Sequence, residues 1–182
     1  MVCFFSLHSQ GCNIVFSKED LMKLYIKQRV FSWTDKFSVK DEYGNNRYFV
    51  QGELFSWGKR LHVSDAFNRE VVFIQQKVWS WKPRYLVYIN GVQVAEIVRE
   101  FTFFKPRYSV LGLGWDIDGE FFSHDYTAVK NGRPIVTISK EWFTWGDSYV
   151  LDIADPRDEL PALAVVLAID CAMESQNSSS SN

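Results

Sequence analysis

The feature that most constrains the fold is an aromatic repeat. Two aromatic residues separated by one serine recur at an interval of 24 residues, as Phe31-Ser32-Trp33, Phe55-Ser56-Trp57 and Trp79-Ser80-Trp81. The series continues with Phe104 and Phe143-Thr144-Trp145, and it has a degraded member in Phe122-Ser123-His124. Aromatic residues favour strands, and a fixed period of this length indicates one repeated supersecondary unit. We therefore predict a chain built from similar strand units.

Turn signals lie between the aromatic pairs and divide each unit into two strands. They are Gly44-Asn45-Asn46, Phe67-Asn68-Arg69, Asn90-Gly91, Gly112-Leu113-Gly114 and Asn131-Gly132. Asn-Gly between alternating apolar residues is the strongest short-range hairpin signal. One hairpin per period is too little for a four-stranded propeller blade. Six hairpins supply twelve strands, which can close into an antiparallel barrel with no exposed edge or form a two-sheet sandwich.

The apolar C-terminal segment favours the barrel. Leu160–Met173 contains one charged residue, Asp170, and has no polar face, so an amphipathic surface helix is a poor interpretation. Fourteen helical residues span about 21 Å, and a bilayer core of about 30 Å needs around twenty, so we expect no transmembrane segment. The helix must therefore be buried in protein. Its predicted core residues are Leu160, Leu163, Val166, Leu167 and Ile169.

A barrel of twelve strands has an interior of the right size for one helix. Strands about 4.8 Å apart and tilted by about 40° give a backbone radius of roughly 12 Å. A helix about 10 Å wide fills such an interior. The predicted fold is thus mainly β, a closed antiparallel barrel of twelve strands enclosing a central hydrophobic C-terminal α-helix.

Length and composition predict one domain. The 182 residues are 47% hydrophobic and 23% charged, which is typical of a globular protein. Residues 1–21 are interpreted as a dispensable N-terminal extension, 22–175 as the barrel domain with its helix over 158–175, and 176–182 as a disordered polar tail. The three cysteines form no C-x-x-C pair and no secretory leader is evident, so we expect a reducing, cytoplasmic location.

The first strand units resemble a known family. The run Leu24-Tyr25-Ile26-Lys27-Gln28-Arg29-Val30-Phe31-Ser32-Trp33, followed by Asp35-Lys36-Phe37, Asp41-Glu42-Tyr43-Gly44 and Val50-Gln51-Gly52-Glu53, is similar to the LURP-one-related family. The resemblance extends from Met22 to Met173. It implies the tubby-like fold, a twelve-stranded barrel around a hydrophobic helix shared with tubby C-terminal domains and phospholipid scramblases. Because tubby domains bind phosphoinositide headgroups and scramblases associate with membranes, it also implies a link to lipids.

The sequence offers no catalytic or metal-binding motif. There is no Gly-rich phosphate loop, no G-x-S-x-G elbow and no Cys/His cluster with zinc spacing, so we expect no enzyme activity and no cofactor. Asp116, Asp118 and Glu120 lack the spacing of a calcium loop and are interpreted as a solvated strand face. His124 stands at an aromatic corner rather than in an evident acid–base pair. We expect Asp170 to lie near the barrel mouth and to meet a Lys, an Arg or a backbone N–H.

The best candidate for a binding surface is a repeated Lys-Pro-Arg-Tyr. Lys82 and Arg84 recur as Lys105 and Arg107 in the next unit, so four basic groups are expected side by side at one rim of the barrel. Such groups can attract anionic headgroups, although they can also merely keep a corner soluble. Lys and Arg exceed Asp and Glu by 15 to 8 over 22–110 and are outnumbered 4 to 12 over 111–182, without a continuous basic stripe. We expect no binding of nucleic acid.

These observations predict a non-enzymatic binding or scaffold module of the LURP-one-related type. Its partners are expected to be anionic phospholipid headgroups, at a peripheral position on a membrane, or another protein. The alternative is a carrier or enzyme that acts on a small apolar ligand held inside the barrel, which requires an interior cavity.

Overall fold

The computed structural model describes residues 22–27, 36–53, 56–102, 105–141 and 148–179. The strands are β1 (Met22–Lys27), β2 (Phe37–Asp41), β3 (Asn46–Gly52), β4 (Arg60–Asp65), β5 (Glu70–Gln76), β6 (Arg84–Ile89), β7 (Val92–Glu100), β8 (Arg107–Leu111), β9 (Asp116–Glu120), β10 (Asp125–Lys130), β11 (Arg133–Glu141) and β12 (Ser148–Ile153). Two 3-10 turns, η1 (Phe121–Ser123) and η2 (Pro156–Asp158), precede β10 and the helix α1 (Glu159–Ser179).

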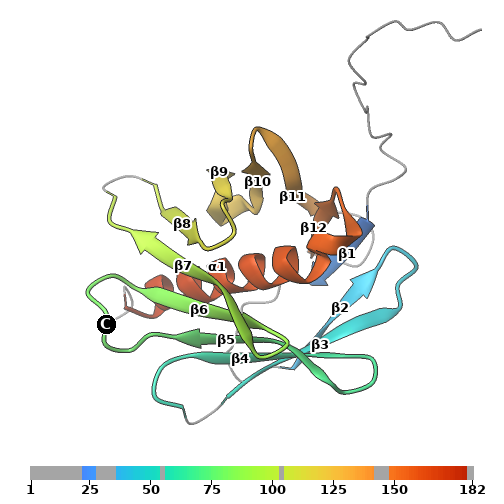
Figure 1. Ribbon diagram of the computed structural model, residues 1–182, viewed down its shortest axis with the longest axis horizontal. Coiled ribbons are helices and arrows are strands. Elements are labelled where there is room, and N and C mark those ends of the chain that lie inside the picture. The colour runs from blue at the N-terminus through green and yellow to red at the C-terminus, as the bar shows by residue number, and fades with distance from the viewer. Residues whose placement is uncertain (1–21, 28–35, 54–55, 103–104, 142–147, 180–182) are drawn as a thin grey trace, which may run out of the picture.

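All twelve strands form one antiparallel sheet, which excludes the two-sheet sandwich. Strands that are neighbours in the chain pair with each other except for β8 and β9, and β1 pairs with β12 with Leu24 opposite Leu151. The prediction of a fully closed barrel is wrong at one joint. The strands β8 and β9 remain the two ends of the sheet, and among the described residues only the bridge between Val110 and Trp115 joins them. Figure 1 shows the strongly curved sheet bringing these two strands toward each other.

The predicted turns fall between consecutive strands, which pair as hairpins except at Gly112-Leu113-Gly114 between β8 and β9. Asn68, Asn90 and Asn131 have φ values of 61°, 49° and 53°, the left-handed region that asparagine and glycine adopt at low cost. Gly112 has a φ of 101°, and a Cβ on it would lie 2.5 Å from the carbonyl oxygen of Val94. These turns therefore require their residue types, which is why the sequence predicts them.

The helix α1 is the most buried element. Leu163, Val166, Leu167 and Ile169 have no exposed surface, and Leu160 is partly buried against the same core. The helix packs against β5, β6, β7 and β12. It begins one residue later and ends four residues later than the predicted range 158–175. The expected tail 176–182 thus falls partly on its last turn, and 180–182 lie outside the described residues, as does the predicted extension 1–21.

Antiparallel pairing gives the sheet two rims. The hairpin rim carries the turns that follow β2, β4, β6, β8 and β10, and the opposite rim carries the connections that follow β3, β5, β7 and β9. Ion pairs hold α1 at both rims. Arg47, at the start of β3, contacts Glu159 at the hairpin rim, where Tyr48 also donates a hydrogen bond of 2.8 Å to Glu159. At the opposite rim Lys59 lies 3.3 Å from Glu174.

Candidate functional site

Large apolar side chains are exposed at the rim opposite the hairpins. Trp57, Trp79 and Trp81 expose 80%, 87% and 92% of their surface to solvent. We call this surface the tryptophan rim and define it by Trp57, Val78, Trp79, Trp81, Phe101 and Phe122, all exposed on connections at that rim. Several exposed apolar side chains on one rim commonly mark an interaction site, because apolar surface is unfavourable in contact with water.

The two connections that carry the tryptophans are anchored to each other. Gln76 donates a backbone hydrogen bond of 2.7 Å to the carbonyl of Lys59, whose own N–H donates to the Gln76 side chain at 3.0 Å. Gly58 packs so closely on Val78 that a Cβ would lie 2.6 Å from its Cγ2. Trp57 and Trp79, one residue from this contact on each side, are thus presented by adjacent, hydrogen-bonded loops.

The aromatic pairs predicted a repeated strand unit and not an exposed surface. The repeat was the signal that could have identified the rim, because a corner that only packs inward does not need tryptophan at its outermost position. In the repeated Lys-Pro-Arg-Tyr, the residues that pack inward are Tyr85 and Tyr108, which are 0% and 5% exposed. The remaining members of the repeat, Phe31-Ser32-Trp33, Phe55, Phe104 and Phe143-Thr144-Trp145, lie outside the described residues.

The predicted basic residues lie on neighbouring segments beside the tryptophan rim, and most have carboxylate partners. Lys82 donates to Glu100, and Lys105 donates to Glu120. The first of these bonds is the main reason why the pKa of Glu100 lies below its usual value.

The two arginines of the repeat differ in their partners. Arg84 donates a bond of 2.7 Å to Glu96. Arg107 forms no ion pair within the part of the chain that the structure describes. Three of the four predicted basic groups are therefore largely neutralised.

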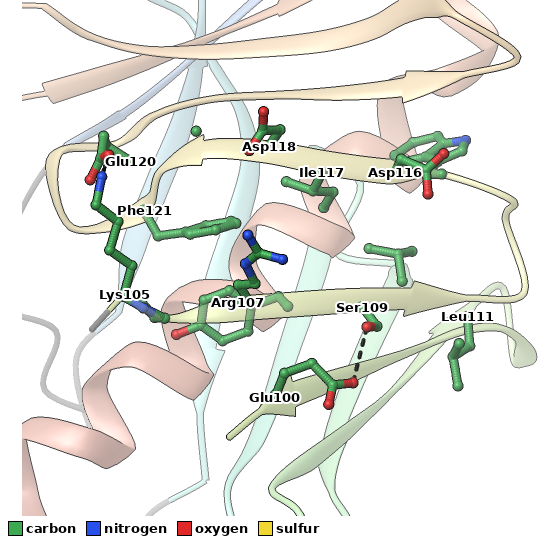
Figure 2. Close-up of a pocket in the computed structure, with 15 residues that line it drawn as sticks. Glu100, Lys105, Arg107, Ser109, Leu111, Asp116, Ile117, Asp118, Glu120 and Phe121 are labelled. Atoms are coloured by element: carbon green, nitrogen blue, oxygen red, sulfur yellow. Dashed lines mark hydrogen bonds and ion pairs between the residues drawn. The ribbon is translucent and has the colours of Figure 1, made fainter. Parts of the chain in front are cut away.

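A pocket opens at the seam between β8 and β9. It has a volume of about 850 Å³, and its lining includes Glu100, Arg107, Tyr108, Trp115, Asp118 and Phe121. Figure 2 shows the Arg107 side chain rising from β8 into the gap, while the carboxylate of Asp118 points away from β8. This pocket was not predicted, because a fully closed barrel has no gap between β8 and β9.

Asp170 has partners other than those predicted. Tyr149 donates a hydrogen bond to Asp170 Oδ2, and the His124 Nε2 lies 3.3 Å from Oδ1. Among the described residues these two side chains take the place of the expected Lys, Arg or backbone N–H. The corner after η1 turns His124 inward in the left-handed conformation and stacks it on Tyr149 at 4.2 Å. Burial raises the pKa of Tyr149 well above its usual value, with the charge of Asp170 adding to the effect.

The polar groups around Asp170 are incompletely paired. His124 Nδ1 and the hydroxyls of Tyr108 and Tyr126 are buried without a hydrogen-bond partner among the described residues. No three His, Cys, Asp or Glu side chains in the described ranges gather in a geometry suited to a metal ion. Within the same ranges, no helix combines the length and apolar character that a membrane crossing requires.

Comparison with known proteins identifies relatives of this chain in sequence and in fold. The chain is 33% identical over 153 residues to the uncharacterized protein YxjI of Bacillus subtilis (strain 168), a match that covers 84% of this chain and 94% of that protein. An X-ray structure of an Arabidopsis thaliana protein superposes with a TM-score of 0.57 at 12% identity, over 82% of this chain and 90% of that one. That likeness concerns the fold alone. The family model described as LURP-one-related matches residues 22–170, and the chain therefore belongs to the LURP-one-related family.

Proposed function

We propose that this LURP-one-related protein is a non-enzymatic binding module that docks peripherally on the cytoplasmic face of a membrane through its tryptophan rim. The observation that carries the proposal is the near-complete exposure of Trp57, Trp79 and Trp81 on loops anchored to one another. Tryptophan is enriched at membrane–water interfaces because its ring is apolar and its N–H remains hydrogen-bonded.

The proposal includes the tubby-like arrangement, in which α1 fills the interior of the barrel. It is supported by the absence of exposed surface on Leu163, Val166 and Leu167 and by the contacts of α1 with both β5–β7 and β12. An interior filled in this way leaves no room for the apolar ligand of a carrier, so binding is assigned to the outer surface.

The tryptophans are expected to contribute more to the free energy of membrane binding than the basic residues. Burying half of a tryptophan side chain, roughly 100 Å² at about 25 cal/mol per Å², contributes about 2.5 kcal/mol. A basic residue near an anionic surface contributes about 1 kcal/mol, and less when a carboxylate already neutralises it. Lys77 and Arg107, which are exposed and form no ion pair among the described residues, are the cations best placed to add to binding.

The test is flotation of the full chain with neutral phosphatidylcholine vesicles and with vesicles containing phosphatidylserine, at low and physiological salt. The chain is expected to float with both, more strongly with the anionic vesicles. Changing Trp57, Trp79 and Trp81 to Ser is expected to weaken partitioning at least a hundredfold, from the burial estimated above.

Two basic variants separate the contributions of charge. Lys77→Ala with Arg107→Ala should reduce the preference for anionic vesicles and its salt sensitivity, with partitioning into neutral vesicles unchanged. The larger variant with Lys82, Arg84, Lys105 and Arg107 changed to Ala tests the whole predicted basic surface. Absence of flotation under every condition, or flotation that the tryptophan changes leave intact, would overturn the proposal.

A further inference from the structure

The hairpin formed by β8 and β9 is open. Its two strands are joined by a short turn and are bridged at Val110 and Trp115, but they pair nowhere else among the described residues. Continuing the register of that bridge would place Arg107 opposite Asp118. Instead the strands separate beyond the bridge, and the pocket of about 850 Å³ lies between them (Figure 2).

The open hairpin presents unpaired backbone groups on both sides of the gap. The N–H and C=O groups of successive strand residues point to alternate neighbours. Because Val110 and Trp115 point to each other across the seam, Tyr108 on β8 and Ile117 and Gly119 on β9 also direct their backbone groups into the gap. None of these three has a backbone partner there in the part of the chain that the structure describes. Unpaired strand edges are templates for a further strand.

The side chains beside the gap define what such a strand would carry. Tyr108 and Ile117 pack toward the core, so the guest side chain between them must be apolar. The outward positions alternate with these. Lys105 is paired with Glu120, and Glu100 with Lys82. This leaves Arg107 on β8 against two carboxylates on β9, Asp116 and Asp118, and the Asp118 carboxylate points away from β8 (Figure 2). One negative charge is therefore left uncompensated in the described part of the seam.

We infer that the seam between β8 and β9 binds an extended peptide segment of a partner protein by strand addition, and that this segment carries a basic side chain beside Asp116 with apolar residues on either side. The guest pairs with the backbone at Tyr108, Ile117 and Gly119 and fills the gap in the sheet. This surface includes none of the side chains that define the tryptophan rim, and the two proposals share only Arg107, so strand addition does not depend on membrane docking.

The test uses the capped peptide acetyl-Val-Lys-Val-Thr-Val-amide and the full chain labelled with ¹⁵N. Titration is expected to shift the amide signals of Tyr108, Ile117 and Gly119, and saturation is expected to slow their hydrogen exchange at least tenfold. Replacing the peptide lysine by glutamate should weaken binding roughly fivefold to tenfold, because the attraction between the lysine and Asp116 across the strands becomes a repulsion between two carboxylates. Asp116→Asn should remove most of that preference.

A proline peptide, acetyl-Val-Lys-Pro-Thr-Val-amide, controls for binding by side chains alone. It lacks the central N–H, so strand addition predicts the loss of its binding. Equal binding of the proline and valine peptides would overturn the inference. So would slow exchange of the Tyr108, Ile117 and Gly119 amides without peptide, because it would show that β8 and β9 already pair with each other in solution. Failure of every peptide to shift these signals would also overturn it.

Discussion

Both rims of the barrel expose aromatic side chains, but they do so in different settings. At the hairpin rim Tyr43 and Phe67 each follow an aspartate whose carboxylate caps the turn. Asp41 Oδ1 accepts from the backbone N–H of Tyr43 at 2.9 Å, and Asp65 Oδ1 accepts from that of Phe67 at 2.9 Å. These rings lie singly on separate turns, and the Arg69 guanidinium lies over the Phe67 ring, 5.3 Å from its centre. Trp57 and Trp79, in contrast, lie on adjacent loops that are hydrogen-bonded to each other. Exposure alone therefore does not identify an interaction surface, whereas several exposed rings on loops anchored to one another indicate one.

The largest loss of stability is expected from a charge placed in α1, the helix that is held at both rims. Leu167→Asp places a carboxylate in the hydrophobic core, at a position with no exposed surface. An unpaired buried charge costs several kcal/mol, enough to unfold most domains of this size. We expect loss of the cooperative thermal transition, measured by circular dichroism. Leu167→Met, which keeps the volume, should cost less than about 1.5 kcal/mol. A Leu167→Asp chain as stable as the parent would contradict the assignment of α1 as the core.

The second largest loss of stability is expected from a substitution in a turn of the hairpin rim. Gly112→Ala should destabilise the fold by about 2–3 kcal/mol, because the new Cβ meets the Val94 carbonyl at 2.5 Å and the φ of 101° is unsuited to alanine. Gly114→Ala is the matched control, since no atom lies within 4 Å of its Cβ. Chemical denaturation should place its cost near 1 kcal/mol. Equal costs for the two variants would show that the turn relaxes.

A third prediction tests the comparison of the rims directly. Tyr43→Ser combined with Phe67→Ser removes two exposed rings from the hairpin rim. Vesicle flotation is expected to remain as in the parent chain, and the free energy of unfolding is expected to change by less than about 0.5 kcal/mol per site. A loss of flotation comparable to that of the tryptophan variant would mean that docking is not specific to one rim.

The smallest expected effect is a pH-dependent change in stability at His62, which lies on β4 between the two rims. Burial lowers the pKa of His62, but hydrogen bonds to Glu70 and Glu53 outweigh it, so the pKa in the folded chain lies above the usual value. The stabilisation is thus fully present below the pKa of the unfolded chain, about 6.5, and is lost as the pH rises through the higher folded value.

Because the His62 side chain is partly exposed, this stabilisation is expected to be below about 1 kcal/mol. Denaturation curves of the parent and of His62→Gln, compared between acidic and weakly alkaline pH, measure it. The difference between the two chains should shrink as the pH rises. A difference that grows with pH would refute the assigned sign.

The sequence predicted the parts of the fold that rest on local rules. Asn-Gly turns fix their own geometry, and a helix that is apolar on every side requires burial whatever surrounds it. The open seam could not be predicted, since a break between β8 and β9 depends on how far the whole sheet curves. Nor could the partners of Asp170, because the inward turn of His124 depends on the left-handed corner after η1. The paired state of Lys82, Arg84 and Lys105 depends on glutamates of β7 and β9, whose position opposite these groups a motif does not reveal.

The position of α1 after all twelve strands in the chain has a consequence for biosynthesis. The inward faces of β5, β6 and β7 pack on a helix that the ribosome produces after every strand. At about 5–20 residues per second, the interval between Met22 and Glu159 is on the order of ten seconds. Throughout that time the nascent strands expose apolar faces and lack the segment that covers them. The barrel is therefore expected to complete its folding only after α1 has been made, and its newly made strands are expected to bind chaperones.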